Sequence, residues 1–268
     1  MTGKRDDGYH LLDSLAVFAG AADRISFMPS DTFAFSVTGP FAAALAAEPD
    51  NLVSRAARML AEISGGPLTG SLTVDKHLPV ASGIGGGSAD AAAALRLLCR
   101  VWRLRLADQE VAGIASRLGA DVPVCVPNRP MRMGGVGEEL TPAPWLPPCG
   151  LVLVNPGVPL ATASVFRARA PGNDSPRAVL PDRWDTAEDM AASLRLLTND
   201  LEAPAISLVP AIRDVLHAIE GTRNCLLARM SGSGATCFGL YANIRDAEAA
   251  TRELARPGWW SWGGPLAR

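Results

Sequence analysis

The chain has 268 residues, of which 48% are hydrophobic and 19% charged, as in globular proteins with a sizeable buried core. Its formal net charge is −2 and its Lys and Arg are scattered, so no basic field indicates nucleic acid as a partner. No apolar run reaches the ~18 residues of a membrane span, so we expect no membrane partner. Five cysteines without a C-x-x-C pair are typical of buried thiols in a reducing compartment, and we expect a cytoplasmic protein.

Hydrophobic spacing in the first half of the chain predicts strands and helices in alternation. The expected strands are 14–18, 24–27 and 71–76, and the expected helices are 51–63, 88–104 and 108–118. Asp108 is a plausible N-cap of the last of these helices. The helix over 51–63 should bury one face, formed by Leu52, Ala56, Met59, Leu60 and Ile63.

The segment 141–150 holds four prolines in ten residues, so we expect no regular structure there. It is the best candidate for a boundary and divides the chain into a lobe over 1–148 and a lobe over 149–268. Beyond it the pattern predicts a buried strand, a loop, three helices and a closing strand. These are the strand 151–154, the loop 177–186, the helices 190–197, 211–219 and 246–254, and the strand 237–241. The sequence therefore predicts an α+β protein in two parts.

A glycine-rich loop stands between the strand at 71–76 and the helix that follows. Gly83, Gly85, Gly86 and Gly87 let the backbone adopt unusual angles and approach a ligand closely. Unpaired amides and the positive end of the helix dipole then favour a phosphate group. The loop is neither a P-loop nor a dinucleotide fingerprint nor a nucleophile elbow, since their key residues are missing. The plainer alternative is a flexible loop capped by Ser88 or Asp90.

The segment from Pro79 to Ala92 resembles the second motif of the GHMP kinases. The resemblance implies a two-lobed α+β fold, with an N-terminal lobe like domain 2 of ribosomal protein S5 and a ferredoxin-like C-terminal lobe. It also implies ATP and Mg²⁺ as cofactors, with Ser88 as a candidate contact of the metal and no metal site built from the protein alone. The residues expected to wrap the ATP phosphates are Pro79, Val80, Ala81, Ser82, Gly83, Ile84, Gly85, Gly86, Gly87, Ser88 and Ala89.

Other segments resemble one branch of these enzymes, the 4-diphosphocytidyl-2-C-methyl-D-erythritol kinases. They are 8–14, 118–125, 135–138, 199–202 and 229–238. The resemblance implies transfer of the γ-phosphate of ATP to the 2-hydroxyl of 4-(cytidine 5'-diphospho)-2-C-methyl-D-erythritol, in the non-mevalonate route to isopentenyl diphosphate. The expected partners are this small molecule and ATP, with the protein a monomer or a weak homodimer.

Phosphoryl transfer needs a group that receives the proton of the attacking hydroxyl. Asp121 lies in a short turn between a helix and Pro123, so from the sequence alone it could be that base or a helix cap. The resemblance makes Asp121 the catalytic aspartate.

Tyr9 and His10 follow a glycine turn and could stack against and hydrogen-bond a nucleobase, although a surface pair in a hairpin is the plain reading. The resemblance implies that they hold the cytosine of the substrate. It also implies that Phe166 covers the other side of the ring, although Phe166 could equally be a core residue. Thr162 is expected to contact the substrate.

A second Gly/Ser loop precedes the strand at 237–241. Two glycines in one tight turn indicate a close approach to a ligand, against the alternative of an ordinary turn. The resemblance places this loop beside the substrate and the phosphates. Its residues are Ser231, Gly232, Ser233 and Gly234.

Kinases of this branch begin with a strand that carries a catalytic Lys and a substrate-binding Asn, and we expect that strand to be missing before Thr2. The 268-residue form should then be poorly active or inactive, and equal turnover by this form and an upstream-extended form would refute this. A phosphate- or nucleotide-binding module without catalysis is the alternative from another class. Another GHMP kinase is the second alternative, which Tyr9 and His10 argue against because homoserine and mevalonate carry no base to stack.

Overall fold

The computed structural model describes residues 1–45, 50–170, 172 and 174–267. The chain forms two compact units. The first comprises residues 1–21, 81–84 and 129–268, and the second comprises residues 22–80 and 85–128. These units follow contacts in space and are not divided at residue 148, so the lobes at 1–148 and 149–268 remain a prediction.

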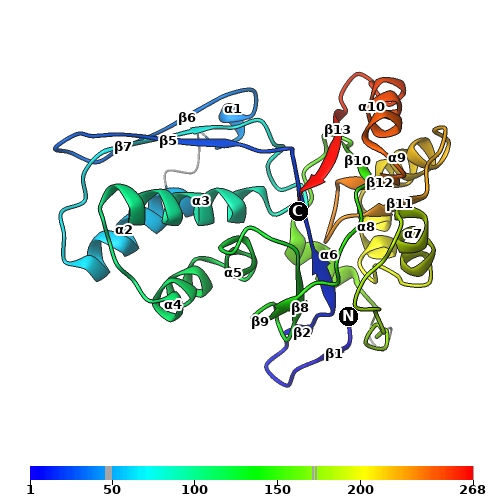
Figure 1. Cartoon of the computed structure of the whole chain (residues 1–268), viewed down its shortest axis with the longest axis horizontal. Helices are drawn as coiled ribbons and strands as arrows, with labels where there is room; N and C mark the ends of the chain where they lie inside the picture. Colours follow the sequence, from blue (N-terminus) through cyan, green and yellow to red (C-terminus); the bar gives the residue numbers. More distant parts are fainter. Residues whose placement is uncertain (46–49, 171, 173, 268) are drawn as a thin grey trace. The chain divides into compact units, whose positions relative to one another are not determined.

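The second unit combines a three-stranded sheet with a helical layer (Figure 1). β7 (Ser71–Asp75) lies in the middle, antiparallel to β5 (Arg24–Met28) and parallel to β6 (Ala34–Thr38). Strand predictions at 24–27 and 71–76 are confirmed. The helices are α1 (Ala42–Leu45), α2 (Leu52–Ser64), α3 (Gly86–Val101), α4 (Asp108–Leu118) and α5 (Val122–Cys125).

Helix α2 begins where the sequence indicates, but its buried face differs in part from the predicted one. The Asn51 side chain caps it by accepting from the amides of Val53 and Ser54. The buried apolar side chains are Val53, Ala56, Ala57, Leu60 and Ala61. The predicted face was therefore wrong at its edge, since Ile63 is 42% exposed. Small alanines let α2 pack closely on α3, and this displaces the buried stripe.

One other helix cap and one helix start differ from the prediction. Helix α4 covers 108–118 as expected, but its N-cap is Ala107, whose amide donates to the Glu110 carboxylate at 2.7 Å. The expectation of Asp108 as the cap was wrong because Glu110, one turn on, satisfies the free amide. Helix α3 begins at Gly86 and not at Ser88.

The first unit is built on a five-stranded antiparallel sheet in the order β11-β12-β10-β13-β4. Its strands are β11 (Leu227–Met230), β12 (Cys237–Tyr241), β10 (Gly150–Asn155), β13 (Trp260–Ala267) and β4 (Phe18–Ala19). Its helices are α6 (Thr162–Ala168), α7 (Ala187–Arg195), α8 (Glu202–Leu208), α9 (Ala211–Glu220) and α10 (Ile244–Glu253). The predicted strands at 151–154 and 237–241 and the three predicted helices are confirmed, with α7 starting earlier, after its cap Thr186.

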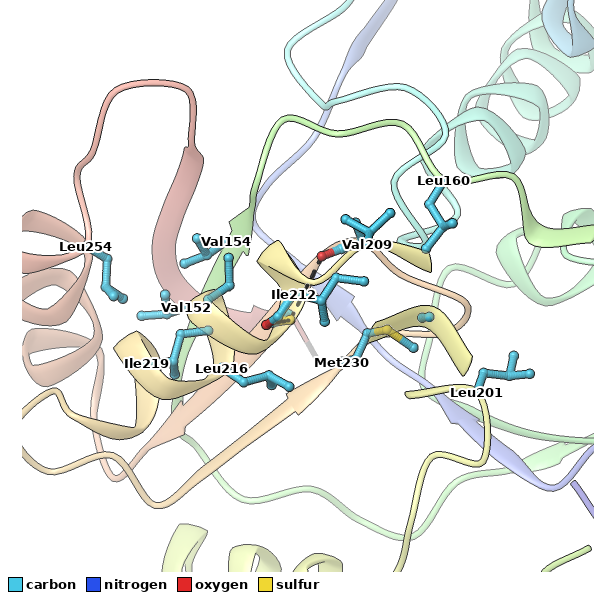
Figure 2. Close-up of a cluster of buried hydrophobic side chains, with 14 of the residues drawn as sticks. Val152, Val154, Leu160, Leu201, Val209, Ile212, Leu216, Ile219, Met230 and Leu254 are labelled. Carbon is cyan, nitrogen blue, oxygen red and sulfur yellow. Dashed lines mark hydrogen bonds between the residues drawn. The ribbon is translucent and has the colours of Figure 1, made fainter. Parts of the chain in front are cut away.

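Both faces of this sheet are covered. Val152 and Val154 of β10 face a core that includes α9 and α10, part of which Figure 2 shows. Leu151 and Leu153 face the other way, against Trp184 and helix α7. Because side chains alternate across a strand, coverage of both faces buries every residue of β10, as its unbroken apolar run predicts.

Two small sheets complete the first unit. β1 (Gly3–Lys4) pairs with β2 (His10–Leu11), and β8 (Met131–Gly134) lies between β3 (Ser14–Ala16) and β9 (Glu139–Pro142). The predicted strand at 14–18 is thus divided between β3 and β4, which join different sheets.

The proline-rich segment 141–150 is regular at both ends, contrary to expectation. Thr141 and Pro142 end β9, and Gly150 begins β10. Pro142 is tolerated because it is the last residue of an edge strand, where a missing amide costs little. No helix in the described part of the chain is long and apolar enough to cross a membrane.

Candidate active site

The glycine loop is shaped by three residues with positive φ, namely Ala81 (50°), Gly83 (75°) and Gly85 (68°). Gly85 is the N-cap of α3, and within the described structure no side chain caps this helix end. Neither Ser88 nor Asp90 caps the helix, so the plainer alternative of a loop capped by one of them is wrong on this point. The first amides of α3 and the helix dipole remain available to an anion such as phosphate.

Residues 81–84 of this loop pack within the first unit against the loop that precedes β12. The amide of Thr236 donates to the carbonyl of Ser82 at 3.0 Å, and the hydroxyl of Ser231 donates to the carbonyl of Gly83 at 3.0 Å. A Cβ on Gly83 would lie 2.4 Å from the carbonyl oxygen of Gly234. The close approach that the sequence indicated for these glycines is thus, in this structure, an approach of two loops to each other.

Next to the start of α3, the second unit buries three charged groups. The Lys76 ammonium lies 2.5 Å from the Asp23 carboxylate and 2.8 Å from that of Asp90. Asp23 also accepts from the amides of His77 and Leu78 at 2.6 and 2.8 Å. The side chain of Lys76 is only 3% exposed, so the three groups depend on one another for charge compensation.

The charge of Asp90 is not fully compensated. Burial raises its pKa, the ammonium of Lys76 opposes this rise, and the Asp23 carboxylate adds to it, which leaves the pKa at about 6. A Cβ on Gly86 would lie 3.5 Å from the Lys76 nitrogen, so this ammonium sits directly against the first residue of α3. Asp90 does not cap the helix but pairs with Lys76, whose ammonium lies against the helix start.

Asp121 occupies the N-cap position of the short helix α5 in the second unit. Its side chain remains accessible to solvent, while burial by the protein atoms beside it raises the pKa of its carboxyl. Arg96 of α3 donates to the carbonyls of Cys125 and Val126 at the end of α5, at 2.8 and 3.1 Å. The aspartate therefore stands on a helix that is fixed to α3, and its raised pKa suits a proton acceptor.

Tyr9 and His10 lie at the end of the hairpin between β1 and β2. Tyr9 is 64% exposed, and Gly8 before it has a φ of 91°. The His10 ring lies 5.1 Å from the Phe166 ring, centroid to centroid, at an interplanar angle of 41°. The structure thus brings His10 to Phe166. Among the described residues, it records no ring contact of Tyr9 with either.

The imidazole of His10 is poised to bind as a neutral group. Burial and the nearby charges of Arg169 and Lys4 lower its pKa. Its Nδ1 atom is buried and has no hydrogen-bond partner within the described residues. A neutral imidazole with one free nitrogen can accept or donate one hydrogen bond to a base edge.

Thr162 and Ser233, predicted separately, are joined by a hydroxyl–hydroxyl hydrogen bond of 2.8 Å. Thr162 is the first residue of α6, the helix that also carries Phe166. The Gly/Ser loop is therefore linked to the helix that carries the aromatic residue. Four of the predicted substrate residues, namely His10, Thr162, Phe166 and Ser233, thus make contacts in two pairs.

Two models of known protein families match parts of this chain. Residues 51–128 match the GHMP kinases N terminal domain, and residues 180–258 match the GHMP kinases C terminal. The 4-diphosphocytidyl-2-C-methyl-D-erythritol kinase of Gluconacetobacter diazotrophicus is 51% identical, over 99% of this chain and 90% of its own length. The protein of the same name from Paramagnetospirillum magneticum is 52% identical, over 97% of this chain and 91% of its own.

The chain belongs to the GHMP kinases, in the family of the 4-diphosphocytidyl-2-C-methyl-D-erythritol kinases. A crystal structure of a 4-(cytidine 5'-diphospho)-2C-methyl-D-erythritol kinase matches with a TM-score of 0.82 at 31% identity, covering 100% of this chain and 94% of the other. Homoserine kinase from Cytophaga hutchinsonii, at 16% identity and a TM-score of 0.67, covers 91% of this chain and 85% of its own, and shares the fold. The predicted family, the α+β GHMP kinase fold and a small-molecule kinase as the class of enzyme are confirmed.

Two arrangements of charged groups, one around Lys76 and one around Asp13, were not predicted from the sequence. The burial of Lys76 could not be predicted from the sequence, since a lysine that ends an alternating strand normally faces solvent. Asp13, which follows the His10 strand, accepts two bonds from Arg132 at 2.7 and 2.8 Å and one from the amide of Ala178 at 2.7 Å. The spacing of 119 residues between Asp13 and Arg132 hides this pair from any local pattern.

ATP fits the chemistry of the loop, since free amides at a helix start suit a phosphate chain. A metal ion would need ligands from elsewhere. Among the described residues, no three His, Cys, Asp or Glu side chains cluster in a way that could hold one. Mg²⁺ prefers oxygen donors, and in this part of the chain the half-buried hydroxyl of Ser88 is one such group.

Proposed function

We propose that this kinase transfers the γ-phosphate of ATP to the 2-hydroxyl of 4-(cytidine 5'-diphospho)-2-C-methyl-D-erythritol, a step of isoprenoid synthesis. The observation that carries the proposal is the identity of 51–52% over nearly the whole chain with kinases named for this substrate. The His10–Phe166 pair adds an independent chemical reason, because it offers a base-sized aromatic surface and a free ring nitrogen.

The triphosphate is held by the glycine loop in this proposal. The amides at the start of α3 donate to phosphate oxygens, and the helix dipole favours their negative charge. Residues 79–89 are the binding segment, of which Gly87 is exposed and Ser88 is half-buried. Mg²⁺, when bound, neutralises charge on the phosphates.

Asp121 receives the proton of the reacting hydroxyl. The hydroxyl oxygen attacks the γ-phosphorus, the bond from that phosphorus to the bridging oxygen of ADP breaks, and the proton passes to the Asp121 carboxylate. A pKa raised by burial strengthens this carboxylate as a base. Positioning and charge stabilisation supply most of the rate, as in other phosphoryl transfers.

The cytosine is recognised at the hairpin and helix α6. Phe166 covers one face of the base, His10 hydrogen-bonds its edge, and exposed Tyr9 closes over the other face. Thr162 and the 231–234 loop contact the rest of the substrate, since the Thr162–Ser233 bond holds them together.

Three finer points belong to the proposal. We expect Mg²⁺ as the metal and a monomer or weak homodimer as the assembly. We also expect a cytoplasmic protein, which its five free thiols support.

The experiment is a substrate comparison with purified protein, ATP and Mg²⁺. The cytidine compound, homoserine and mevalonate are offered separately, and ADP and the phosphorylated product are followed by ³¹P NMR. We expect turnover with the cytidine compound alone. Turnover of homoserine or mevalonate instead would overturn the choice of substrate. ATP binding without any transfer would support a nucleotide-binding module.

A further inference from the structure

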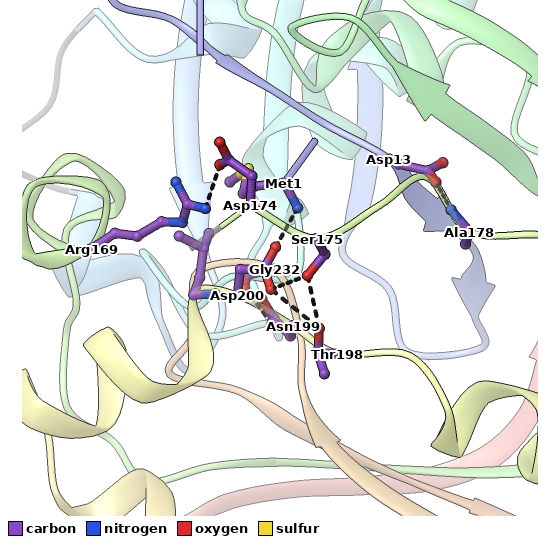
Figure 3. A network of polar contacts seen from close by, with 11 residues as sticks. Met1, Asp13, Arg169, Asp174, Ser175, Ala178, Thr198, Asn199, Asp200 and Gly232 are labelled. Atoms are coloured by element: carbon purple, nitrogen blue, oxygen red, sulfur yellow. Dashed lines mark hydrogen bonds and ion pairs between the residues drawn. The ribbon is translucent and has the colours of Figure 1, made fainter. Parts of the chain in front are cut away.

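The segment Asn199-Asp-Leu-Glu202 makes polar contacts with the backbone of the Gly/Ser loop. The Asn199 amide nitrogen donates to the carbonyl of Met230 at 3.0 Å and to that of Gly232 at 2.8 Å, the latter visible in Figure 3. The Glu202 carboxylate accepts from the amide of Met230 at 3.0 Å. Two side chains from the start of α8 thus satisfy three backbone groups of the strand end and loop.

The segment is itself fixed in place. The side-chain oxygen Oδ1 of Asn199 accepts from the backbone amide of Leu201 at 3.0 Å, which orients the side-chain NH₂ group towards the loop. Asp200 next to it accepts from the hydroxyls of Ser175 and Thr198 at 2.7 and 3.2 Å (Figure 3). Because both ends of the Asn199 amide are engaged, its donor direction is specified by the structure.

The loop that Asn199 holds is the one that shapes residues 82 and 83 of the glycine loop. Its Thr236 amide and Ser231 hydroxyl donate to the carbonyls of Ser82 and Gly83, both at 3.0 Å. The contacts therefore run from Asn199 through 231–236 to the segment that is proposed to bind ATP phosphates. All of these residues belong to the first compact unit.

We propose that Asn199 and Glu202 are positioning residues for ATP binding, which act by bracing the 230–236 loop and through it Ser82 and Gly83. This inference rests on the proposed function of the glycine loop. Gly232 and Gly234 adopt positive φ, 53° and 83°. Because a glycine backbone has many accessible conformations, fixed partners are needed to hold the loop in this one.

Isosteric variants separate the brace from general stability. Asn199→Asp keeps the acceptor for the Leu201 amide but loses both donor bonds to the loop. Glu202→Gln retains an acceptor for Met230, whereas Glu202→Ala does not. Asn224→Asp is the matched control, since the amide of exposed Asn224 donates at 3.1 Å to Asp246, away from the loop.

The 268-residue protein is assayed for the dissociation constant of a non-hydrolysable ATP analogue, for kinetics, and for amide exchange in peptides covering 82–83 and 230–236. We expect Asn199→Asp and Glu202→Ala to weaken analogue binding roughly tenfold, from the loss of two and one hydrogen bonds respectively. Exchange in both segments should rise, while Glu202→Gln and Asn224→Asp stay near wild type.

The outcomes separate this inference from the proposed function. Unchanged analogue affinity and exchange in Asn199→Asp would overturn the brace even if the wild type transfers phosphate. Equal losses in Asn224→Asp would overturn it as well, by showing a non-specific effect. If the wild type binds the analogue but transfers no phosphate, the proposed function fails while the affinity and exchange readouts still decide the brace.

Discussion

The ammonium of Lys76 lies 2.8 Å from the carboxylate of Asp90 in the second unit, and a second carboxylate, Asp23, lies 2.5 Å from the same nitrogen. Two buried negative charges thus share one positive charge. Burial and Asp23 outweigh the attraction of Lys76, which leaves the Asp90 pKa at about 6. The excess charge makes this part of the molecule sensitive to pH.

The sign of that sensitivity follows from linkage. A carboxyl whose pKa is higher in the folded than in the unfolded chain stabilises the fold below its ordinary pKa, and this contribution is lost as the pH rises through about 6. Asp90→Asn resembles the protonated form at every pH. We therefore expect its unfolding free energy, relative to wild type, to rise by on the order of 2 kcal/mol from pH 4 to pH 7. Urea titrations at several pH values measure this, and parallel pH profiles for the two proteins would refute it.

The Asp13–Arg132 pair should show the opposite dependence. Burial alone would raise the pKa of Asp13, but the hydrogen bonds from Arg132 and the Ala178 amide lower it below its usual value. Its stabilisation is present above the unfolded pKa and is lost as the pH falls through the lowered value. Asp13→Asn should cost about 1–3 kcal/mol of unfolding free energy at pH 7 and much less at pH 3.

Asp185→Asn is the control for this prediction. Asp185 also pairs with an arginine, Arg183, but both side chains are about 70% exposed, at 71% and 68%. Solvent screens such a pair, so its loss should cost less than about 1 kcal/mol at any pH. Equal losses in the two variants would show that burial does not decide the strength of these pairs.

The sequence predicts those helices and strands of this fold that have a local hydrophobic pattern. β10 and β12 are apolar runs, and α4 was predicted to its last residue because spacing alone specifies it. Lys76 and its partners could not be predicted, since Asp23 lies 53 residues away and a buried lysine has no local pattern.

The candidate site likewise has parts that the sequence predicts and parts that it does not. The glycine segments at 83–87 and 231–234 were visible because repeated glycine is costly unless the backbone requires it. The pairing of His10 with Phe166 joins a strand and a helix that lie far apart in the sequence. It was therefore expected only from the family resemblance. That Ser231 binds the Gly83 carbonyl was not anticipated at all.

Gly83 is expected to tolerate no side chain. Its φ is 75° and a Cβ would lie 2.4 Å from the Gly234 carbonyl oxygen, so Gly83→Ala must displace one of the two loops. We expect at least a tenfold rise in KM for ATP, since a displacement of the loop removes more than one hydrogen bond. Steady-state kinetics at varied ATP measure it.

Gly113→Ala provides the contrast. Gly113 lies within α4, and a Cβ there would meet nothing within 4 Å. Alanine should raise the unfolding free energy by roughly 0.5–1 kcal/mol because glycine is the poorer helix former. A loss of ATP affinity in Gly113→Ala as large as that in Gly83→Ala would contradict the steric argument.

Phe166 should contribute to binding of the cytidine compound and not of ATP. Phe166→Ala removes the ring that lies 5.1 Å from His10, and a lost base stack of about 1–3 kcal/mol corresponds to a rise of roughly 5- to 150-fold in KM for that substrate. Phe166→Tyr, which keeps a ring, should stay close to wild type. A rise in KM for ATP with no change for the cytidine compound would assign Phe166 to the other substrate.

Asp121 should affect turnover more than binding. Asp121→Asn keeps the size of the side chain but removes the proton acceptor, so we expect kcat to fall by roughly 100- to 10,000-fold with little change in either KM. Asp108→Asn, at an exposed position on α4 of the same unit, is the control and should leave kcat unchanged. Because burial raises the pKa of Asp121, wild-type kcat should begin to fall on acidification at a pH above the ordinary carboxyl range. Retention of wild-type kcat by Asp121→Asn would show that positioning and charge stabilisation suffice without this base.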